Sequence, residues 1–382
     1  MKRTLRIAVA VAIVLSLNAC ATKVKTFPRE VTSKEKRQVN FAHDFDTFGA
    51  HLISALDAPP GYDLNRQKVK VDYQYYLDPK LQADPRSFYP RPAAPPEVTL
   101  LEKVMDTPEV EVRFIKWDSQ YQPRNPAFAP LYATYVEDHT AFGIYVRAKK
   151  GNRAAMVISH GWTGGDIHST WKAERMLDYA ALGYDTILVQ QPYHGPRAPQ
   201  DSKFSGEYFL SGEVSRLNEA LCQTVTDVRS MVMWLREKYP VVGIKGGSLG
   251  GITTLQTAAV EDKIDFAIAW VPPSSLGDIP EDTPLAPFVV KGMRASGLDR
   301  DMVKKILFVS SPANFQPMIP KENVLIFAGM GDNFVPPSQP ERVWAAWGQP
   351  EIVWFAGGHV LNFQLQQCRE KEREFMIARL PQ

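Results

Sequence analysis

One serine lies among glycines in the segment Gly246-Gly247-Ser248-Leu249-Gly250, between an apolar stretch at 241–244 and a helical pattern that starts at Ile252. A serine on a sharp turn between a strand and a helix is exposed for nucleophilic attack, and glycines flank it because side chains there would clash. The hydroxyl is a weak nucleophile until a base takes its proton. The alternative is a glycine-rich loop that merely exposes a serine.

Two later residues suit the base and the acid that would orient it. Asp332 follows the apolar run 324–328, and His359 follows the run 352–355. Carboxyl ends of parallel strands meet at one edge of a sheet, which is where sites of open α/β sheets form. We therefore predict that His359 takes the proton of Ser248, while Asp332 fixes the tautomer of the imidazole and stabilises its charged form.

Each of these residues also has a simpler interpretation. Asp332 lies in Gly-Asp-Asn, a combination of residues that favours turns, so it could be a plain turn residue. His359 could be a loop histidine without a role. Asp278, which follows the strand ending at Trp270, is the alternative acid. The order serine, acid, histidine at three strand ends favours the joint assignment.

Short apolar runs alternate with helical patterns from residue 154 onward. Continuous apolar strands alternating with helices indicate a parallel sheet covered on both faces. We expect strands at 154–159, 186–189, 241–244, 266–270, 324–328 and 352–355, and helices at 171–182, 213–238, 252–260, 340–347 and 361–378. Alternating patterns at 110–114, 133–136 and 141–146 predict an antiparallel entry to this sheet.

Residues 110–380 resemble serine hydrolases of the α/β-hydrolase superfamily in the serine turn, the acid and the histidine. The resemblance implies a mostly parallel, twisted sheet with helices on both faces and a small lid at 271–320, although that insertion could also be a surface excursion. The segment His160-Gly161-Trp162 resembles the oxyanion loop of this superfamily. The resemblance implies that the backbone N–H groups of Trp162 and Leu249 bind the oxyanion, and that His160 shapes the loop.

The segment Gln191-Pro192-Tyr193-His194-Gly195 is similar to one in the dienelactone-hydrolase-like and prolyl-oligopeptidase-like branches. The resemblance implies that Tyr193 and His194 lie at the mouth of the site and contact substrate. Tyr193 either donates a hydrogen bond to substrate or packs within the protein.

The N-terminus combines the basic residues Lys2, Arg3 and Arg6 with an apolar run at 7–17 and Leu17-Asn18-Ala19-Cys20. This pattern resembles a bacterial lipoprotein signal, which implies a signal peptide at 1–19 and a lipid-modified Cys20 carrying palmitate-type acyl chains. The alternative is an ordinary secretory signal with a chance cysteine. The residues after Cys20 lack the aspartate that retains such proteins at the inner membrane, so we expect an outer-membrane anchor facing the periplasm.

Residues 20–108 are expected to be a tether and a proline-rich extension, followed by the hydrolase-like domain at 109–382. The tether covers 21 to about 40, an amphipathic helix is predicted at 41–56, and prolines make 58–98 irregular.

The composition is that of a globular protein, with 45% hydrophobic and 23% charged residues. Removal of residues 1–19 takes away three cations and no anions, so the formal net charge changes from +2 to −1. A nearly neutral chain gives no sign of nucleic-acid binding. Cys222 and Cys368 are expected to be buried thiols that do not pair, because the helices that carry them are predicted to cover opposite faces of the sheet. Their spacing does not suit zinc.

The favoured function is a membrane-anchored serine hydrolase that cleaves carboxylic esters, with a small-molecule or lipid ester as substrate and no metal or organic cofactor. Acyl transfer or peptide cleavage would use the same three residues. The non-enzymatic alternative is an envelope-binding or scaffolding lipoprotein whose hydrolase fold has lost its catalytic activity. The sequence carries no signal for oligomeric state.

Overall fold

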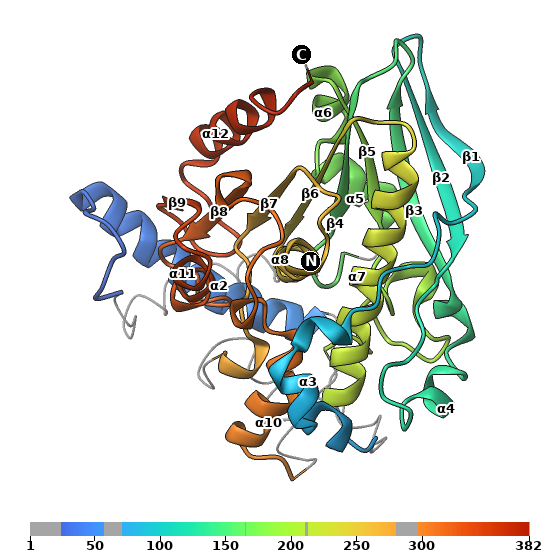
Figure 1. The fold of residues 1–382 in the computed structure, drawn as a ribbon. Helices are drawn as coiled ribbons and strands as arrows, with labels where there is room; N and C mark the ends of the chain where they lie inside the picture. The colour runs from blue at the N-terminus through green and yellow to red at the C-terminus, as the bar shows by residue number, and fades with distance from the viewer. Residues whose placement is uncertain (1–23, 57–70, 165, 211–212, 280–296, 382) are drawn as a thin grey trace, which may run out of the picture.

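A computed structural model describes residues 24–56, 71–164, 166–210, 213–279 and 297–381 (Figure 1). Residues 1–19, which are predicted to be a signal peptide, and Cys20 therefore lie outside the described residues. Within the described ranges, no helix is both long and apolar enough to cross a membrane.

A nine-stranded sheet forms the centre of the molecule, in the order β1-β2-β3-β5-β4-β6-β7-β8-β9. The first three strands and the β3–β5 pair are antiparallel, and all other neighbours are parallel. The predicted parallel sheet with an antiparallel entry is thus confirmed. The strands are β1 (Thr99–Asp106), β2 (Val110–Asp118), β3 (Thr140–Ala148), β4 (Ala154–Ser159), β5 (Tyr184–Val189), β6 (Val241–Gly247), β7 (Phe266–Trp270), β8 (Val324–Gly329) and β9 (Glu351–Phe355).

Helices cover both faces of this sheet (Figure 1). One apolar core lies under α7 (Val214–Arg236), α8 (Leu249–Val260) and α11 (Ser338–Ala346). The other lies under α5 (Ile167–Ala173), α6 (Met176–Leu182) and α12 (Leu365–Ile377). Cys222 belongs to the first core and Cys368 to the second, and both are buried free thiols, as predicted.

Helix α2 (Ser33–Leu56) starts eight residues before the predicted helix, inside the segment expected to be a tether. Glu35 caps its first turn by accepting from the backbone N–H of Thr32, at 2.8 Å. Val39 is fully buried against Met330 and Ala356, next to the ends of β8 and β9. Packing against these strand ends, which the local sequence does not reveal, therefore makes residues 33–40 part of the folded domain.

Three further elements differ from the sequence prediction. Residues 133–136 are not a strand: they connect α4 (Ala129–Tyr132) to a 3-10 helix that begins at Val136. Local backbone hydrogen bonds, such as that from Tyr135 N–H to Tyr132 O, replace strand pairing here. The helix expected at 171–182 is divided into α5 and α6 by Arg175, which has a φ of 57°. The edge strand β1 was not predicted.

The insertion at 271–320 is described except for residues 280–296. Its helix α10 (Arg300–Ile306) follows an Asp299 cap and buries Val303 and Ile306 in the core beneath α7. The described part of the insertion is therefore packed into the domain, and its role as a lid stays a prediction. Outside the insertion, the small helix α3 (Pro79–Ala83) lies in the proline-rich extension.

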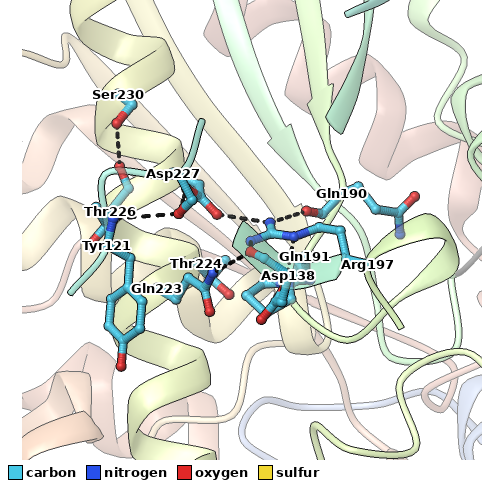
Figure 2. Close-up of polar contacts among 12 residues, drawn as sticks. Tyr121, Asp138, Gln190, Gln191, Arg197, Gln223, Thr224, Thr226, Asp227 and Ser230 are labelled. Carbon is cyan, nitrogen blue, oxygen red and sulfur yellow. Dashed lines mark hydrogen bonds and ion pairs between the residues drawn. The ribbon is translucent and has the colours of Figure 1, made fainter. Parts of the chain in front are cut away.

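A buried ion cluster fixes the loop after β5 to helix α7. Figure 2 shows Arg197 between two carboxylates: its Nε donates to Asp138 at 2.7 Å and its Nη1 to Asp227 at 2.8 Å. The same guanidinium donates to the backbone carbonyl of Gln190 at 2.8 Å. All three charged side chains are 1% exposed or less. The cluster thus anchors the loop that leads from β5 toward the serine edge of the sheet.

We predict that Arg197→Met lowers the free energy of unfolding by about 3–5 kcal/mol, because it leaves two buried carboxylates without a counter-charge. Chemical denaturation monitored by circular dichroism measures this change. Arg147→Met is the matched control, since the side chain of Arg147 is 51% exposed in its ion pair with Glu111. Equal effects of the two substitutions would contradict the structural importance of the cluster.

Candidate active site

Ser248 occupies a strained turn between β6 and α8, with φ 55° and ψ −115°. A side chain on Gly246 would lie 2.2 Å from the carbonyl oxygen of Gly250, and one on Gly250 would lie 2.0 Å from that of Ser159. Both glycines are therefore required for the helix to start this close to the strands. The turn holds the serine at the carboxyl edge of the sheet, as the sequence motif predicts.

The structure brings Ser248, His359 and Asp332 together in one hydrogen-bonded series. Nε2 of His359 lies 2.8 Å from Oγ of Ser248, and its Nδ1 lies 2.7 Å from Oδ2 of Asp332. The three side chains follow β6, β9 and β8, respectively. Because Asp332 accepts from Nδ1–H, the lone pair of Nε2 is directed at the serine hydroxyl, which is the geometry that a general base requires.

The surroundings of His359 favour its charged form. Burial lowers the pKa of the imidazole, but the negative charge of Asp332, its hydrogen bond and the charge of Asp46 outweigh burial and raise the pKa above its usual value. Asp332 is itself fixed, because its second oxygen accepts from the backbone N–H of Val335 at 2.7 Å. The ring of Phe334 lies against the imidazole, with centroids 5.3 Å apart.

The loop after β4 passes directly beside the serine. A Cβ on Gly161 would lie 3.7 Å from Cβ of Ser248. His160 shapes this loop: its Nε2 accepts from the backbone N–H of Gln191 at 3.0 Å, so its Nδ1–H donates to the carbonyl of Gly161 at 2.7 Å. Burial lowers the pKa of His160 to about 4, which keeps the ring neutral.

The predicted oxyanion donors lie on these two neighbouring segments. Leu249 is the first residue of α8, so its backbone N–H has no acceptor within the helix. Trp162 follows Gly161 in the loop, and its indole Nε1–H donates to the carbonyl of Gly206 at 2.8 Å. This contact fixes the indole on the Gly206 carbonyl, so an oxyanion would be bound by the backbone N–H of Trp162 and not by its side chain.

Tyr193 and His194 lie inside the protein rather than at the mouth of the site. Both are fully buried. The ring of Tyr193 packs between Tyr135 and Tyr208, with centroid distances of 5.4 Å and 6.1 Å. Nδ1–H of His194 donates to the carbonyl of Pro192 at 2.8 Å. This burial favours the interpretation that Tyr193 packs within the protein. The geometry does not support substrate contact by Tyr193 or His194.

The alternative acid Asp278 serves a different purpose. Its carboxylate pairs with Lys304 at 3.0 Å and with Arg342. These contacts tie the insertion to α11, and the hydrogen bond to His359 is made by Asp332 instead.

The sequence analysis missed Asp46, whose side chain contacts the backbone of the histidine loop from outside the sheet. This residue of α2 is fully buried and accepts from the backbone N–H of His359 at 2.6 Å. Asp46 stands in the segment predicted to be amphipathic, four residues after the buried Ala42. A carboxylate on the apolar face of a helix is the one signal that could have indicated it, since buried carboxylates need partners.

A cavity of about 580 Å³ lies between α6 and α12 and reaches Gly247 and Trp270. Its buried cation, Lys245, is paired with Glu372 at 3.3 Å and Glu174 at 3.5 Å. Ser248 is not among the described residues that line the cavity. With its central charges paired and the serine outside it, the cavity is not part of the candidate active site.

Comparison of sequences gives relatives without an assigned activity. No protein-family model matches the chain. An uncharacterized protein of Mycobacterium tuberculosis strain H37Rv is 29% identical over 317 residues, which cover 79% of this chain and 72% of that protein. An uncharacterized protein of the Oshkosh strain matches over the same share of each chain, also at 29% identity.

Comparison of structures is more informative about the fold. An acetyl xylan esterase from Paenibacillus sp. R4 superimposes with a TM-score of 0.54 at 14% identity, covering 81% of this chain and 98% of that one. A puromycin-hydrolyzing peptidase of Mycobacterium tuberculosis superimposes with a TM-score of 0.50 at 18% identity, covering 75% of this chain and 39% of the peptidase. The chain has the α/β-hydrolase fold. In this fold the serine turn, the acid loop and the histidine loop meet where the described residues place them.

We predict that the imidazole of His359 titrates above its usual value of 6.5 and that Asp332→Asn lowers this pKa, because the substitution removes the adjacent negative charge. Nuclear magnetic resonance of protein carrying ¹⁵N-labelled histidine measures the titration. Asp278→Asn is the matched control and should leave it unchanged. A shift caused by Asp278→Asn and not by Asp332→Asn would contradict the assignment of the acid.

Proposed function

We propose that the protein is a serine hydrolase that cleaves carboxylic esters through an acyl-enzyme on Ser248. The observation that carries this proposal is the hydrogen-bonded series from the Ser248 hydroxyl through His359 to Asp332, with distances of 2.8 Å and 2.7 Å. The strained backbone of Ser248 and the neighbouring loop after β4 support the same conclusion, because strain at a reactive side chain is common at catalytic sites.

The reaction follows from the geometry of these three residues. Oγ of Ser248 attacks the ester carbonyl carbon while Nε2 of His359 takes the hydroxyl proton. The C–O bond to the alcohol then breaks, and the imidazolium returns that proton to the leaving oxygen. A water molecule next attacks the acyl carbon, gives a proton to Nε2 and releases the acid, and the proton returns to Ser248.

The negative charge that develops on the carbonyl oxygen requires nearby donors. The backbone N–H groups of Leu249 and Trp162 are proposed to bind it, since backbone donors fixed before the reaction cost no reorganisation. Asp332 stabilises the imidazolium during both half-reactions.

Esters are favoured over peptides as the substrate class. The superimposed acetyl xylan esterase is covered over 98% of its length, whereas the superimposed peptidase is covered over 39%. The superposition thus includes nearly the whole esterase chain but only part of the peptidase chain. Acyl transfer to an alcohol would use the same acyl-enzyme, and product analysis with competing alcohols distinguishes it from hydrolysis.

We predict that the protein hydrolyses p-nitrophenyl acetate and that Ser248→Ala lowers kcat by about 10³-fold or more, because it removes the nucleophile. Release of p-nitrophenol measures the rate. Ser338→Ala, at an exposed position at the start of α11, is the control and should retain wild-type turnover. Equal turnover in the wild type and Ser248→Ala would refute the proposed function.

Membrane attachment through a lipid on Cys20 is proposed as a second property. It rests on the apolar run and the Leu17-Asn18-Ala19-Cys20 motif. Acyl chains contribute about 0.8 kcal/mol of membrane binding for each buried CH₂ group, so more than one chain on one residue gives stable anchoring. The enzyme would then act on esters close to an outer membrane.

We predict that cells expressing the full chain incorporate an alkyne-labelled palmitate analogue into the protein and that Cys20→Ser abolishes the label. Cys222→Ser is the matched control, since Cys222 is buried and should not be modified. Fractionation of the envelope reports the membrane that holds the protein. Labelling that persists in Cys20→Ser would contradict lipid attachment at this residue.

A further inference from the structure

Helix α2 reaches the candidate active site through the carboxylate of Asp46. Oδ2 of this carboxylate accepts from the backbone N–H groups of His359 at 2.6 Å and Asn333 at 3.2 Å, and Oδ1 accepts from that of Val360 at 3.1 Å. Asn333 follows the acid Asp332, and Val360 follows His359. A single side chain therefore binds the backbone of both loops that carry the catalytic partners of Ser248.

The two loops are shaped to admit α2. A Cβ on Gly358 would lie 2.5 Å from Oδ2 of Asp46, and one on Gly331 would lie 2.5 Å from the carbonyl oxygen of Val39. Each glycine directly precedes a residue of the series, Asp332 or His359. Their lack of side chains lets the helix approach closely enough for Asp46 to bind the loop backbone.

Further contacts fix the helix in this position. The side-chain amide of Asn333 donates to Oγ1 of Thr47 at 2.8 Å, and Nδ1 of His43 lies 3.3 Å from the carbonyl oxygen of Gly331. In the segment that precedes α2, Arg29 donates to the carbonyl of Trp354 on β9 at 3.2 Å. Helix α2 is thus bound along the side of the acid and histidine loops.

The Asp46 carboxylate is held in an unfavourable electrostatic position. Burial, and then repulsion from Asp332, raise its pKa to about 6, although the charge of His359 and the backbone donors oppose this shift. A buried charge of this kind is costly unless it is compensated. The Asp46 carboxylate is surrounded by three backbone N–H donors, and all three belong to the acid and histidine loops. This arrangement points to a role in the site.

We propose that Asp46 is a positioning residue that fixes the acid and histidine loops from outside the sheet, so that helix α2 supports the site through this side chain. This inference rests on the proposed function. Asp46 does not touch Ser248 or the reacting atoms. It acts through the backbone of His359, and its charge adds to that of Asp332 in favouring the imidazolium.

The substitution Asp46→Asn tests this role, because it keeps the shape of the side chain and removes one charge. We expect kcat for p-nitrophenyl acetate to fall about tenfold with KM within about twofold, since the loop is displaced while the substrate site remains. The midpoint of the His359 titration, followed by nuclear magnetic resonance, should move to lower pH by about half a unit or more.

Asp44→Asn is the matched control, with the same chemical change two residues away on α2. The groups that act on the His359 pKa are Asp332 and Asp46, whereas Asp44 interacts with His43. The control should keep wild-type kcat and the wild-type His359 midpoint. Wild-type values of both quantities in Asp46→Asn, or equal losses in the two variants, would overturn the proposal.

The His359 titration does not depend on turnover, so the two proposals can fail separately. A lack of ester hydrolysis with a shifted midpoint in Asp46→Asn contradicts the substrate class and leaves the positioning role standing.

Hydrogen exchange of the wild type provides a measurement that needs no variant. Val360 is 56% exposed, so its amide would exchange quickly without a partner. We expect this amide to be protected by its bond to Asp46. Exchange of the Val360 amide at the rate of an unstructured loop would overturn the proposal even if Asp46→Asn does not fold.

Discussion

The close approach of α8 to the carboxyl ends of β4 and β6 is the constraint on which the site depends. It exists because Gly246 and Gly250 have no side chains, and it forces Ser248 into a backbone conformation with φ 55°. The hydroxyl is thereby held at a fixed place on the sheet edge, where His359 can reach it. If the turn relaxed, the hydrogen bond between Nε2 and Oγ would be lost, and the loop after β4 would no longer lie beside the serine.

Around this fixed serine, the other partners are held by loops that are themselves bound from two sides. From the sheet, Asp332 follows β8 and binds both the imidazole and the backbone of Val335. From outside, Asp46 of α2 binds the backbone of the same two loops. The neutral ring of His160 holds the loop after β4. At the carboxyl edge of the sheet, polar side chains thus have two tasks: some supply the reactive groups, and others hold the backbone of the loops in place.

The features that could be predicted from the sequence are those that depend on local residue patterns. Apolar runs and helical periodicity located the parallel strands and the principal helices, and strand-end positions identified Ser248, Asp332 and His359. Long-range packing was not accessible: nothing between 33 and 40 indicates that Val39 will be buried against Met330, or that Asp46 will bind loops nearly 300 positions away. The same holds for Tyr193 and His194, whose motif suggested the site mouth but whose side chains fill the core.

The central claim is that Ser248 is the nucleophile, and the most direct measurement is identification of the residue modified by a fluorophosphonate. Such probes react with serines that a neighbouring base has activated. After reaction of the wild-type protein, proteolysis and mass spectrometry should find the phosphonyl group on the peptide that contains Ser248, at one group per chain, and none in Ser248→Ala. A phosphonyl group on another residue, or undiminished modification of Ser248→Ala, would contradict the account.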